Sequence, residues 1–350
     1  MPIEPNQIKF MKSIVVSDTS ANGGRISSVE VATGVKNNLW PDVSTTERTA
    51  GSTKFRKTFI KVASPDNLKL INARVFIETP TPGGDRVLIV GHVADQTNIQ
   101  SDIANLSTEF FGSGQLNANV SIGASTMTVN VEAQTDAIFH QNQLIRISNK
   151  TSVDDLAGSE EFVRIKDLSS AVSWNGNLVT LTLATGTTLE NAYLASNTRV
   201  ASVIEAGDIW AETDDWGLSA STGTFATWDG SGTAPGTLTG ARMVDFIAGI
   251  EQVWTITFTN ATTFTCVGDT VGAVGGGTIS SDFAPNNPDY SRPYFTLPAS
   301  LWGGTWANGD VLTFVTHPAA FPIWEKRIIP PNTASLSGNK VIIGVSGESE

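Results

Sequence analysis

The sequence predicts a mainly β protein made of β-sandwich or barrel-like domains, with a long N-terminal arm and one or two short helices. Three observations lead to this fold class. Short runs rich in β-branched residues recur at close intervals along the chain. Helical spacing of apolar residues is scarce. Hydrophobic residues make up 40% of the 350 positions, which is enough to form packed cores.

Two segments are predicted to be helical. Residues 44–51 open with Ser44-Thr45-Thr46-Glu47, a capping box in which the glutamate stands three positions after the cap. Residues 240–252 carry apolar side chains at helical spacing, although Gly249 interrupts the pattern. Both helices are expected to be short, so the β class is unchanged.

Strands are predicted from runs of β-branched and aromatic residues that turn-forming residues separate. The Asn-Gly pair at 175–176 predicts a hairpin turn ahead of an alternating run. The predicted strands cover residues 74–78, 86–90, 126–131, 144–148, 161–165, 178–183, 199–203, 253–259, 311–316 and 340–345.

The strands suggest three parts. Residues 1–115 are interpreted as an N-terminal arm and a β-domain for assembly. Five strands close together predict that residues 116–206 form a small barrel or sandwich inserted in the chain. Residues 207–350, rich in Trp, Gly and Thr, are interpreted as a C-terminal β-domain that packs with the N-terminal part.

Composition excludes several classes of protein. The net charge is 22 − 34 = −12, which argues against a protein that wraps nucleic acid, and only 16% of residues are charged, which favours a surface covered by other subunits. No apolar stretch is long enough for a membrane helix, and the first residues lack a signal peptide's features. The protein is therefore expected to stay in the cytoplasm, at least initially after its synthesis. The single cysteine, Cys266, is predicted to be buried in a strand.

No catalytic residue, metal or cofactor is expected. His92, His140 and His317 lack zinc-site spacing, and neither a nucleophile elbow nor a phosphate-binding loop is present. Residues 205–216 contain carboxylates between tryptophans. These carboxylates could serve as the acid/base pair of a glycosidase or as calcium ligands, but we interpret the segment as a solvated loop at a domain junction.

A basic run stands out in this acidic chain: Arg48, Lys54, Arg56, Lys57 and Lys61. If residues 54–62 form a strand, Lys54 and Arg56 share one face, and Lys57 and Lys61 share the other. One interpretation is a strand edge that its charges protect from random pairing. The other is a charged seam that meets acidic surface on a neighbouring subunit.

Five tryptophans lie in Gly- and Thr-rich contexts: Trp210, Trp216, Trp228, Trp302 and Trp306. Such residues fill cores, anchor protein interfaces, or stack on sugar rings. Their sequence context favours core positions and keeps glycan stacking as a minority interpretation.

Several stretches resemble virion structural proteins of tailed bacteriophages. They are Asn22-Gly23-Gly24-Arg25-Ile26-Ser27, residues 34–43 with Leu39-Trp40-Pro41-Asp42-Val43, residues 47–51, residues 304–314, and residues 318–327 with Pro322-Ile323-Trp324-Glu325-Lys326-Arg327. The resemblance covers about a third of the chain and includes no catalytic motif.

The resemblance implies a non-enzymatic subunit of a tailed-phage virion, assembled in the host cytoplasm through β-rich interfaces. A tail tube or baseplate component is favoured, because an acidic lumen would let DNA pass without specific binding. The alternatives are a capsid decoration protein on the head exterior and a virion protein that binds a cell-surface glycan or receptor. The expected partners are copies of the chain and other virion proteins. The candidate intersubunit residues are Arg25, Arg48, Lys54, Arg56, Lys57, Lys61, Trp324 and Arg327.

Overall fold

The computed structural model describes residues 2–91, 95–103, 109–152, 155–215, 236–238 and 243–350. Within these ranges the chain is mainly β, as the sequence predicts, and its strands pair antiparallel. The described ranges contain two short α-helices, α1 (Thr45–Ala50) and α2 (Gln100–Ile103). Helix α1 confirms the predicted helix at 44–51, and its capping box is complete: Ser44 Oγ accepts from the Glu47 N–H, and the Glu47 carboxylate accepts from the Ser44 N–H.

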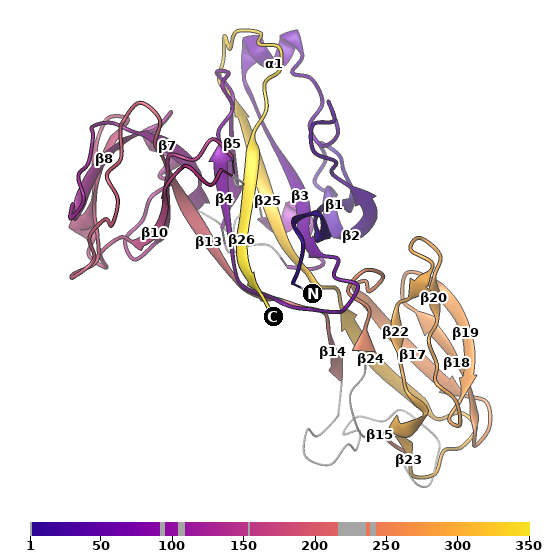
Figure 1. Ribbon diagram of the computed structural model, residues 1–350. Helices are drawn as coiled ribbons and strands as arrows, with labels where there is room; N and C mark the ends of the chain where they lie inside the picture. The colour runs from indigo at the N-terminus through magenta and orange to yellow at the C-terminus, as the bar shows by residue number, and fades with distance from the viewer. Residues whose placement is uncertain (1, 92–94, 104–108, 153–154, 216–235, 239–242) are drawn as a thin grey trace.

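The chain forms three β-rich bodies (Figure 1). The central body contains both ends of the chain, which meet where the Ile3 N–H donates to Ser349 Oγ at 2.9 Å. The inserted lobe, on the left of the view, comprises residues 113–202, and the C-terminal lobe, at lower right, comprises the described residues between 212 and 317.

One sheet of the central body has six strands in the order β2-β1-β3-β25-β5-β6. Strands that are far apart in sequence are neighbours here, because β25 returns from the C-terminal part to pair with β3 and β5. The strands are β1 (Ile8–Val15), β2 (Gly23–Glu30), β3 (Ser52–Val62), β5 (Arg86–Val90), β6 (Phe110–Phe111) and β25 (Ala320–Ile329), and the 3₁₀ turn η1 (Pro5–Gln7) precedes them.

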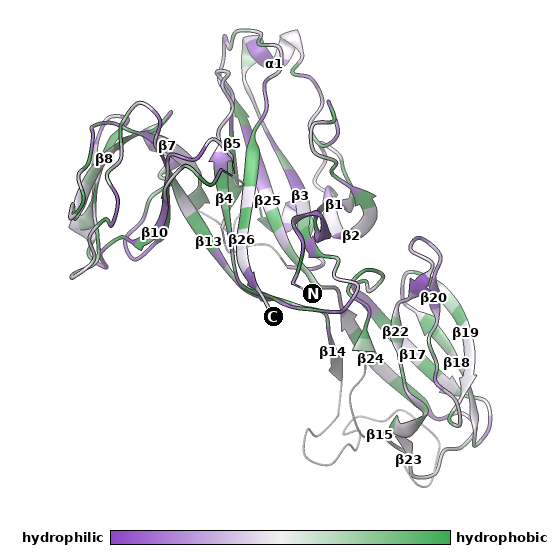
Figure 2. Cartoon of the chain, in the orientation of Figure 1, coloured by the Kyte–Doolittle hydropathy of each residue, from purple (hydrophilic) through white to green (hydrophobic). Residues whose placement is uncertain are grey.

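The second sheet of the central body packs against the first, and the two sheets together form a β-sandwich. It contains β4 (Leu70–Thr79), β26 (Ile342–Ser349) and the second half of β13 (Arg199–Ile209). Ile60 and Ile323 of the first sheet share one core with Val75 and Ile77 of the second. Figure 2 shows hydrophobic segments along these packed strands.

The inserted lobe has a core of its own, and β13 joins it to the central body. The first half of β13 pairs with β7 and β9, while its second half pairs with β4, so a single strand belongs to both bodies. The lobe's remaining elements are β7 (Ser113–Leu116), β8 (Thr126–Asn130), η2 (Gln134–Asp136), β9 (Leu144–Ser148), β10 (Glu160–Arg164), η3 (Ser169–Ala171), β11 (Val172–Asn175) and β12 (Leu178–Thr182). The predicted Asn-Gly turn lies between β11 and β12.

The C-terminal lobe is built on a five-stranded sheet, in the order β14-β24-β17-β18-β19, over an aromatic core. Phe258 and Trp306 stack in this core with ring centroids 4.2 Å apart. The lobe contains β14 (Glu212–Asp215), β15 (Thr237–Leu238), β16 (Met243–Val244), β17 (Gln252–Phe258), β18 (Thr263–Gly268), β19 (Gly272–Thr278), β20 (Asn286–Asn287), β21 (Arg292–Pro293), β22 (Phe295–Thr296), η4 (Ala299–Leu301), β23 (Trp302–Gly303) and β24 (Val311–His317).

Two parts of the chain differ from the sequence-based expectation. The C-terminal lobe ends near residue 317, and β25 and β26 belong to the central body rather than to one domain spanning 207–350. The expected helix at 240–252 is wrong for its described residues: β16 occupies 243–244, and a turn follows in which the Asp245 carboxylate accepts from the N–H groups of Ile247 and Ala248. This local bond competes with helical bonding.

Candidate functional site

Four residues of the basic run lie on β3 in the six-stranded sheet, and the fifth, Arg48, lies in α1. Strand β3 pairs with β25 along residues 52–61 and with β1 along residues 58–62, so the interpretation as a protected edge is wrong for 58–62. Every residue of β3 from Arg56 to Val62 is buried. The charged side chains on β3 are therefore held inside the chain, where each needs a partner.

On the face with Lys54 and Arg56, acidic residues neutralise the charge. Asp18 accepts from Arg56 Nη2 at 2.6 Å and pairs with Lys54 Nζ at 2.7 Å. Lys54 Nζ also lies 2.8 Å from a Glu47 carboxylate oxygen in helix α1. Although partial burial opposes the shift, hydrogen bonds from Lys54 and Ser44 lower the pKa of Glu47 to about 2. These bonds tie α1 to the central body.

On the opposite face the two lysines have neutral partners. Lys57 Nζ donates to the backbone oxygen of Asn98 at 3.0 Å, and Lys61 Nζ donates to that of Ile247 at 2.5 Å. The ring of Tyr290 lies 4.6 Å from Lys61 Nζ. Burial lowers the pKa of Lys57 and that of Lys61 to about 8.

A long connection crosses this sheet, and we call it the strap: residues 31–51, from the end of β2 to the start of β3, including α1. In Figure 1 it runs along the right side of the central body up to α1. None of its residues is buried, and residues 32–37 are all exposed. The strap therefore contributes no side chain to a hydrophobic core.

Three buried charged residues bind the middle of the strap, and we call them the socket: Arg56, Glu325 and Arg327. The Trp40 indole donates from Nε1 to Glu325 Oε2 at 3.2 Å. The guanidinium carbons of Arg56 and Arg327 lie 4.9 and 4.8 Å from the Trp40 ring centroid. Cation–π contacts of this kind are strongest when they are desolvated.

The socket also binds the backbone of the strap. Arg56 Nε donates to the Leu39 oxygen at 3.4 Å, and Arg327 Nη1 donates to the Pro41 oxygen at 3.0 Å. The chain bends at residues 38–40, and the two carbonyls that accept these bonds lie on either side of Trp40. The socket thus binds a bent Leu-Trp-Pro segment through its backbone and its indole.

The charges of the socket are incompletely satisfied. Glu325 is 2% exposed, and burial raises its pKa to about 6, although hydrogen bonds from Thr58 and Trp40 oppose this. Arg327 is 5% exposed, and its Nε and Nη2 have no hydrogen-bond acceptor among the described residues. A buried guanidinium that lacks acceptors carries a free-energy cost.

Five of the eight candidate intersubunit residues are buried in the chain and do not form an exposed seam: Arg56, Lys57, Lys61, Trp324 and Arg327. Pairing of β25 with β3 encloses them, which local patterns did not indicate. The other three also have partners in the chain. Lys54 binds the acids described above, Arg25 pairs with Asp269 at 2.7 Å, and Arg48 donates to the Val43 oxygen at 2.9 Å.

The tryptophan candidates fall into three groups. Trp302 and Trp306 belong to the aromatic core of the C-terminal lobe, and Trp306 is 2% exposed, so its ring is not available for stacking on a sugar. Trp210 is 37% exposed, donates to Glu212 at 3.0 Å, and has Lys69 Nζ 5.1 Å from its ring. Trp216 and Trp228 lie outside the described residues.

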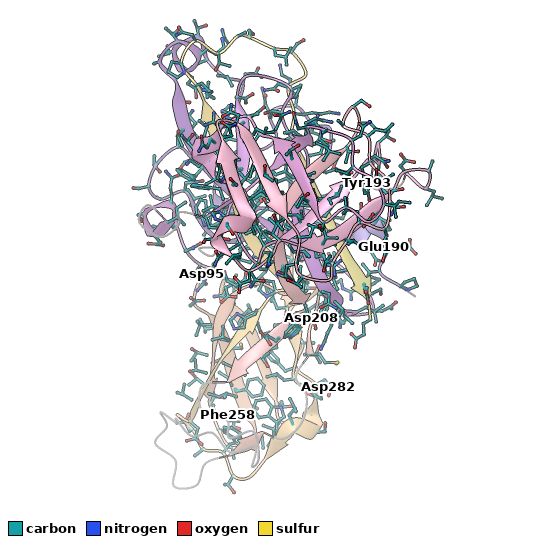
Figure 3. The ribbon with its side chains drawn as sticks, turned by 90° about the vertical axis from the view of Figure 1, so that its left-hand side faces the viewer. Asp95, Glu190, Tyr193, Asp208, Phe258 and Asp282 are labelled. Atoms are coloured by element: carbon teal, nitrogen blue, oxygen red, sulfur yellow. The ribbon has the colours of Figure 1, made fainter. Side chains whose placement is uncertain are left out.

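The acidic group at 205–215 lies in strands β13 and β14 rather than in the expected loop. Glu205 pairs with Arg164 at 2.6 Å, and Asp208 accepts from the Asn72 N–H at 3.0 Å. Figure 3 shows Asp208 where the upper bodies meet the C-terminal lobe. The group does lie at a junction between bodies, and these two carboxylates are engaged by partners in the chain.

Other candidate groups have structural partners. Cys266 is fully buried in β18, as predicted, and burial raises the pKa of its thiol to about 12. His317 Nδ1 lies 2.7 Å from Glu251 Oε2, and His92 lies outside the described residues. Among the described residues, no group of three or more His, Cys, Asp or Glu side chains is placed to hold a metal ion.

A shallow surface hollow of about 440 Å³ lies near the base of α1. Among its lining residues the ionisable side chain is Arg86, which is paired with Asp136. The lining residues are Gly51, Ser52, Thr53, Arg86, Ile328, Ile329, Pro330 and Pro331. This lining provides no acid–base pair.

Four apolar side chains of the N-terminal hairpin are exposed. We call Ile14, Val15, Val16 and Val29 the hairpin patch, and their exposed fractions range from 37% to 59%. Val35, at the exposed part of the strap, is 58% exposed. Ile14 and Val15 lie on β1, Val16 follows it, and Val29 lies on β2, an outer strand of the sheet.

Sequence reasoning did not single out Trp40, Asn98 or Glu325 as site residues. The signal that was available is Glu325-Lys326-Arg327 in an apolar strand, where charges at alternate positions share one face. In the described part of the chain, no helix is long and apolar enough to cross a membrane. Comparisons of the chain with protein-family models, curated proteins and solved structures found no match.

Proposed function

We propose that the chain is a non-enzymatic structural subunit of a tailed-phage virion, a tube or baseplate component of the tail that assembles with copies of itself. The phage context comes from the sequence resemblance. The observation that carries the proposal for assembly is the hairpin patch. Exposed apolar side chains on one hairpin at the outer edge of a sheet offer a surface that another protein can cover.

The arrangement of the three bodies supports a structural role. The central body contains both termini, while the inserted and C-terminal lobes project from it (Figure 1). Shared pairing along β13 connects the inserted lobe to the central body through main-chain hydrogen bonds. Such main-chain connections suit a subunit that holds its neighbours in fixed positions relative to one another.

The charge supports a place along a DNA path. With a net charge of −12, copies arranged in a ring give a lumen that repels a polyanion. In this role DNA is a passing partner that is not bound. The localisation that follows is the virion.

The test is self-assembly of the purified chain. We expect light scattering over a concentration series to show growth in size, and negative-stain images to show rings or tubes with a central channel. A protein that stays monomeric throughout the series would contradict the proposal. A discrete particle that instead binds purified capsids would support head decoration in its place.

A charged substitution in the hairpin patch distinguishes a specific interface from nonspecific association. Val29→Lys is expected to raise the concentration needed for assembly at least tenfold, because a lysine is costly to bury in an apolar contact. The matched control is Ile122→Lys, which replaces an isoleucine that is 69% exposed on the inserted lobe. Equal effects of the two variants would contradict an interface at the patch.

A further inference from the structure

We propose that in the assembled protein the strap binds in trans: Leu39–Val43 of one copy occupies the socket of the next copy. This inference rests on the proposed self-assembly and names the contact that produces it. The partner is therefore a second copy of this chain, recognised through its Leu39-Trp40-Pro41 segment.

The first argument is that the socket demonstrably fits this segment. Its donors reach the carbonyls of Leu39 and Pro41, and its carboxylate accepts from the Trp40 indole. These groups belong to β3 and β25, whereas the segment belongs to the connection between β2 and β3. The same contacts can form with the segment of another copy, as in domain swapping, where an identical element is exchanged.

The second argument is that hydrogen bonds, ion pairs and cation–π contacts, rather than a hydrophobic core, hold the strap to its own chain. No residue from Val31 to Gly51 is buried, so release of the strap exposes no core. Val35 and the adjoining hairpin patch are left uncovered when the strap binds in cis. The 14 residues from Val31 to Ser44, which precede α1, span about 46–50 Å when extended, which lets this part of the strap reach about 25 Å from the sheet.

The third argument is the incomplete satisfaction of Arg327. With the strap in cis, two of its buried guanidinium nitrogens have no acceptor among the described residues. Asp42, next to Pro41, has a carboxylate whose side chain is 67% exposed and pairs with Lys36 at the surface. A strap from another copy is not restrained by β2 and β3 of the same chain, so its Asp42 can approach Arg327. A charge-assisted bond would then replace the missing acceptors.

The test is complementation between two variants that fail for different reasons. Trp40→Ala removes the anchor but keeps the socket, while Arg327→Met alters the socket but keeps the anchor and much of the buried volume. Each variant alone is expected to stay monomeric at concentrations where the wild type assembles. An equimolar mixture is expected to give a 1:1 heterodimer of two 37.0-kDa chains, because only one strap–socket pair can form.

Controls make the result decisive. Thr33→Ala, an exposed strap position without a socket contact, is expected to assemble as the wild type does. Circular dichroism establishes that both variants are folded, and a heterodimer itself requires a folded socket. If either variant assembles like the wild type, or if the mixture remains monomeric, binding in trans is overturned while the proposed function stands. If the wild type does not assemble, the proposed function itself fails.

Discussion

At the residue scale, the most informative feature is the burial of cations without acidic partners. Lys57 is fully buried between aromatic rings, and its ammonium group donates to a backbone carbonyl. Burial of an ammonium group without a counter-ion disfavours its charged form, which is why the pKa falls. Such a residue lowers the free energy of unfolding of the isolated chain, and it restricts which groups can pack around it.

Replacement of this lysine is therefore expected to stabilise the protein. Between about pH 8 and pH 10.4 the unfolded chain holds a proton on Lys57 that the folded chain has released, so Lys57 makes the free energy of unfolding rise with pH through that range. At pH 7 Lys57 is protonated in the folded chain, so the full free-energy cost of burying its charge is present. We expect Lys57→Met to raise the free energy of unfolding in urea by about 1–3 kcal/mol at pH 7, and by less at pH 10.

The matched control is Lys340→Met, because Lys340 is exposed. We expect it to change the free energy of unfolding by less than about 0.5 kcal/mol at either pH. A loss of stability in Lys57→Met at pH 7 would show that its hydrogen bond to Asn98 outweighs the cost of burying the charge.

At the element scale, β13 determines how the inserted lobe is connected. The chain enters the inserted lobe along β7 and leaves it along β13, and these two strands pair with each other, with Gln115 opposite Arg199. The Leu116 N–H donates to the Thr198 oxygen at 3.0 Å, so the lobe begins and ends at adjacent points. A two-residue hairpin turn can close this gap.

We expect a chain in which Asn-Gly replaces residues 117–197 to fold and to assemble. The shortened chain keeps β7 and all of β13, including the half that pairs with β4 in the central body. Leu116→Thr and Val200→Thr accompany the change, because both side chains pack into the lobe's core and would otherwise be exposed. Circular dichroism and light scattering measure the outcome, and an aggregated or unfolded product would place the lobe within the structural core.

At the scale of the whole molecule, assembly brings acidic chains together. Each copy has a net charge of −12, so neighbouring copies repel one another through solvent. Salt reduces this repulsion, because the Debye length is about 30 Å at 0.01 M and about 8 Å at 0.15 M. Apolar contacts and buried charge contacts are screened much less.

Assembly is accordingly expected to strengthen with salt. Raising the sodium chloride concentration from about 0.02 to about 0.3 M should lower the protein concentration at which scattering increases, by several-fold. The variant Val29→Lys is the comparison, since it weakens the apolar contact at every salt concentration. Dissolution of the assemblies by salt would instead indicate an interface made of exposed opposite charges.

Features that short segments encode could be predicted from the amino-acid sequence. The mainly β class, the capped helix at 44–51, the Asn-Gly turn at 175–176 and the buried strand position of Cys266 all follow from patterns within about ten residues. Periodicity and capping act locally, so one sequence suffices to find them.

Which strands are neighbours, and hence which charges are buried, depends on long-range pairing that is seen only in the folded chain. Strand β3 becomes a central strand because β25, more than 250 positions later, pairs along it from Lys61–Ala320 to Ser52–Ile329. That pairing brings Arg56 of the basic run together with Glu325 and Arg327 of β25 in the socket that binds Trp40. No local pattern specifies it, because strand pairing depends on the packing of both sheets and on the free energy of the whole chain.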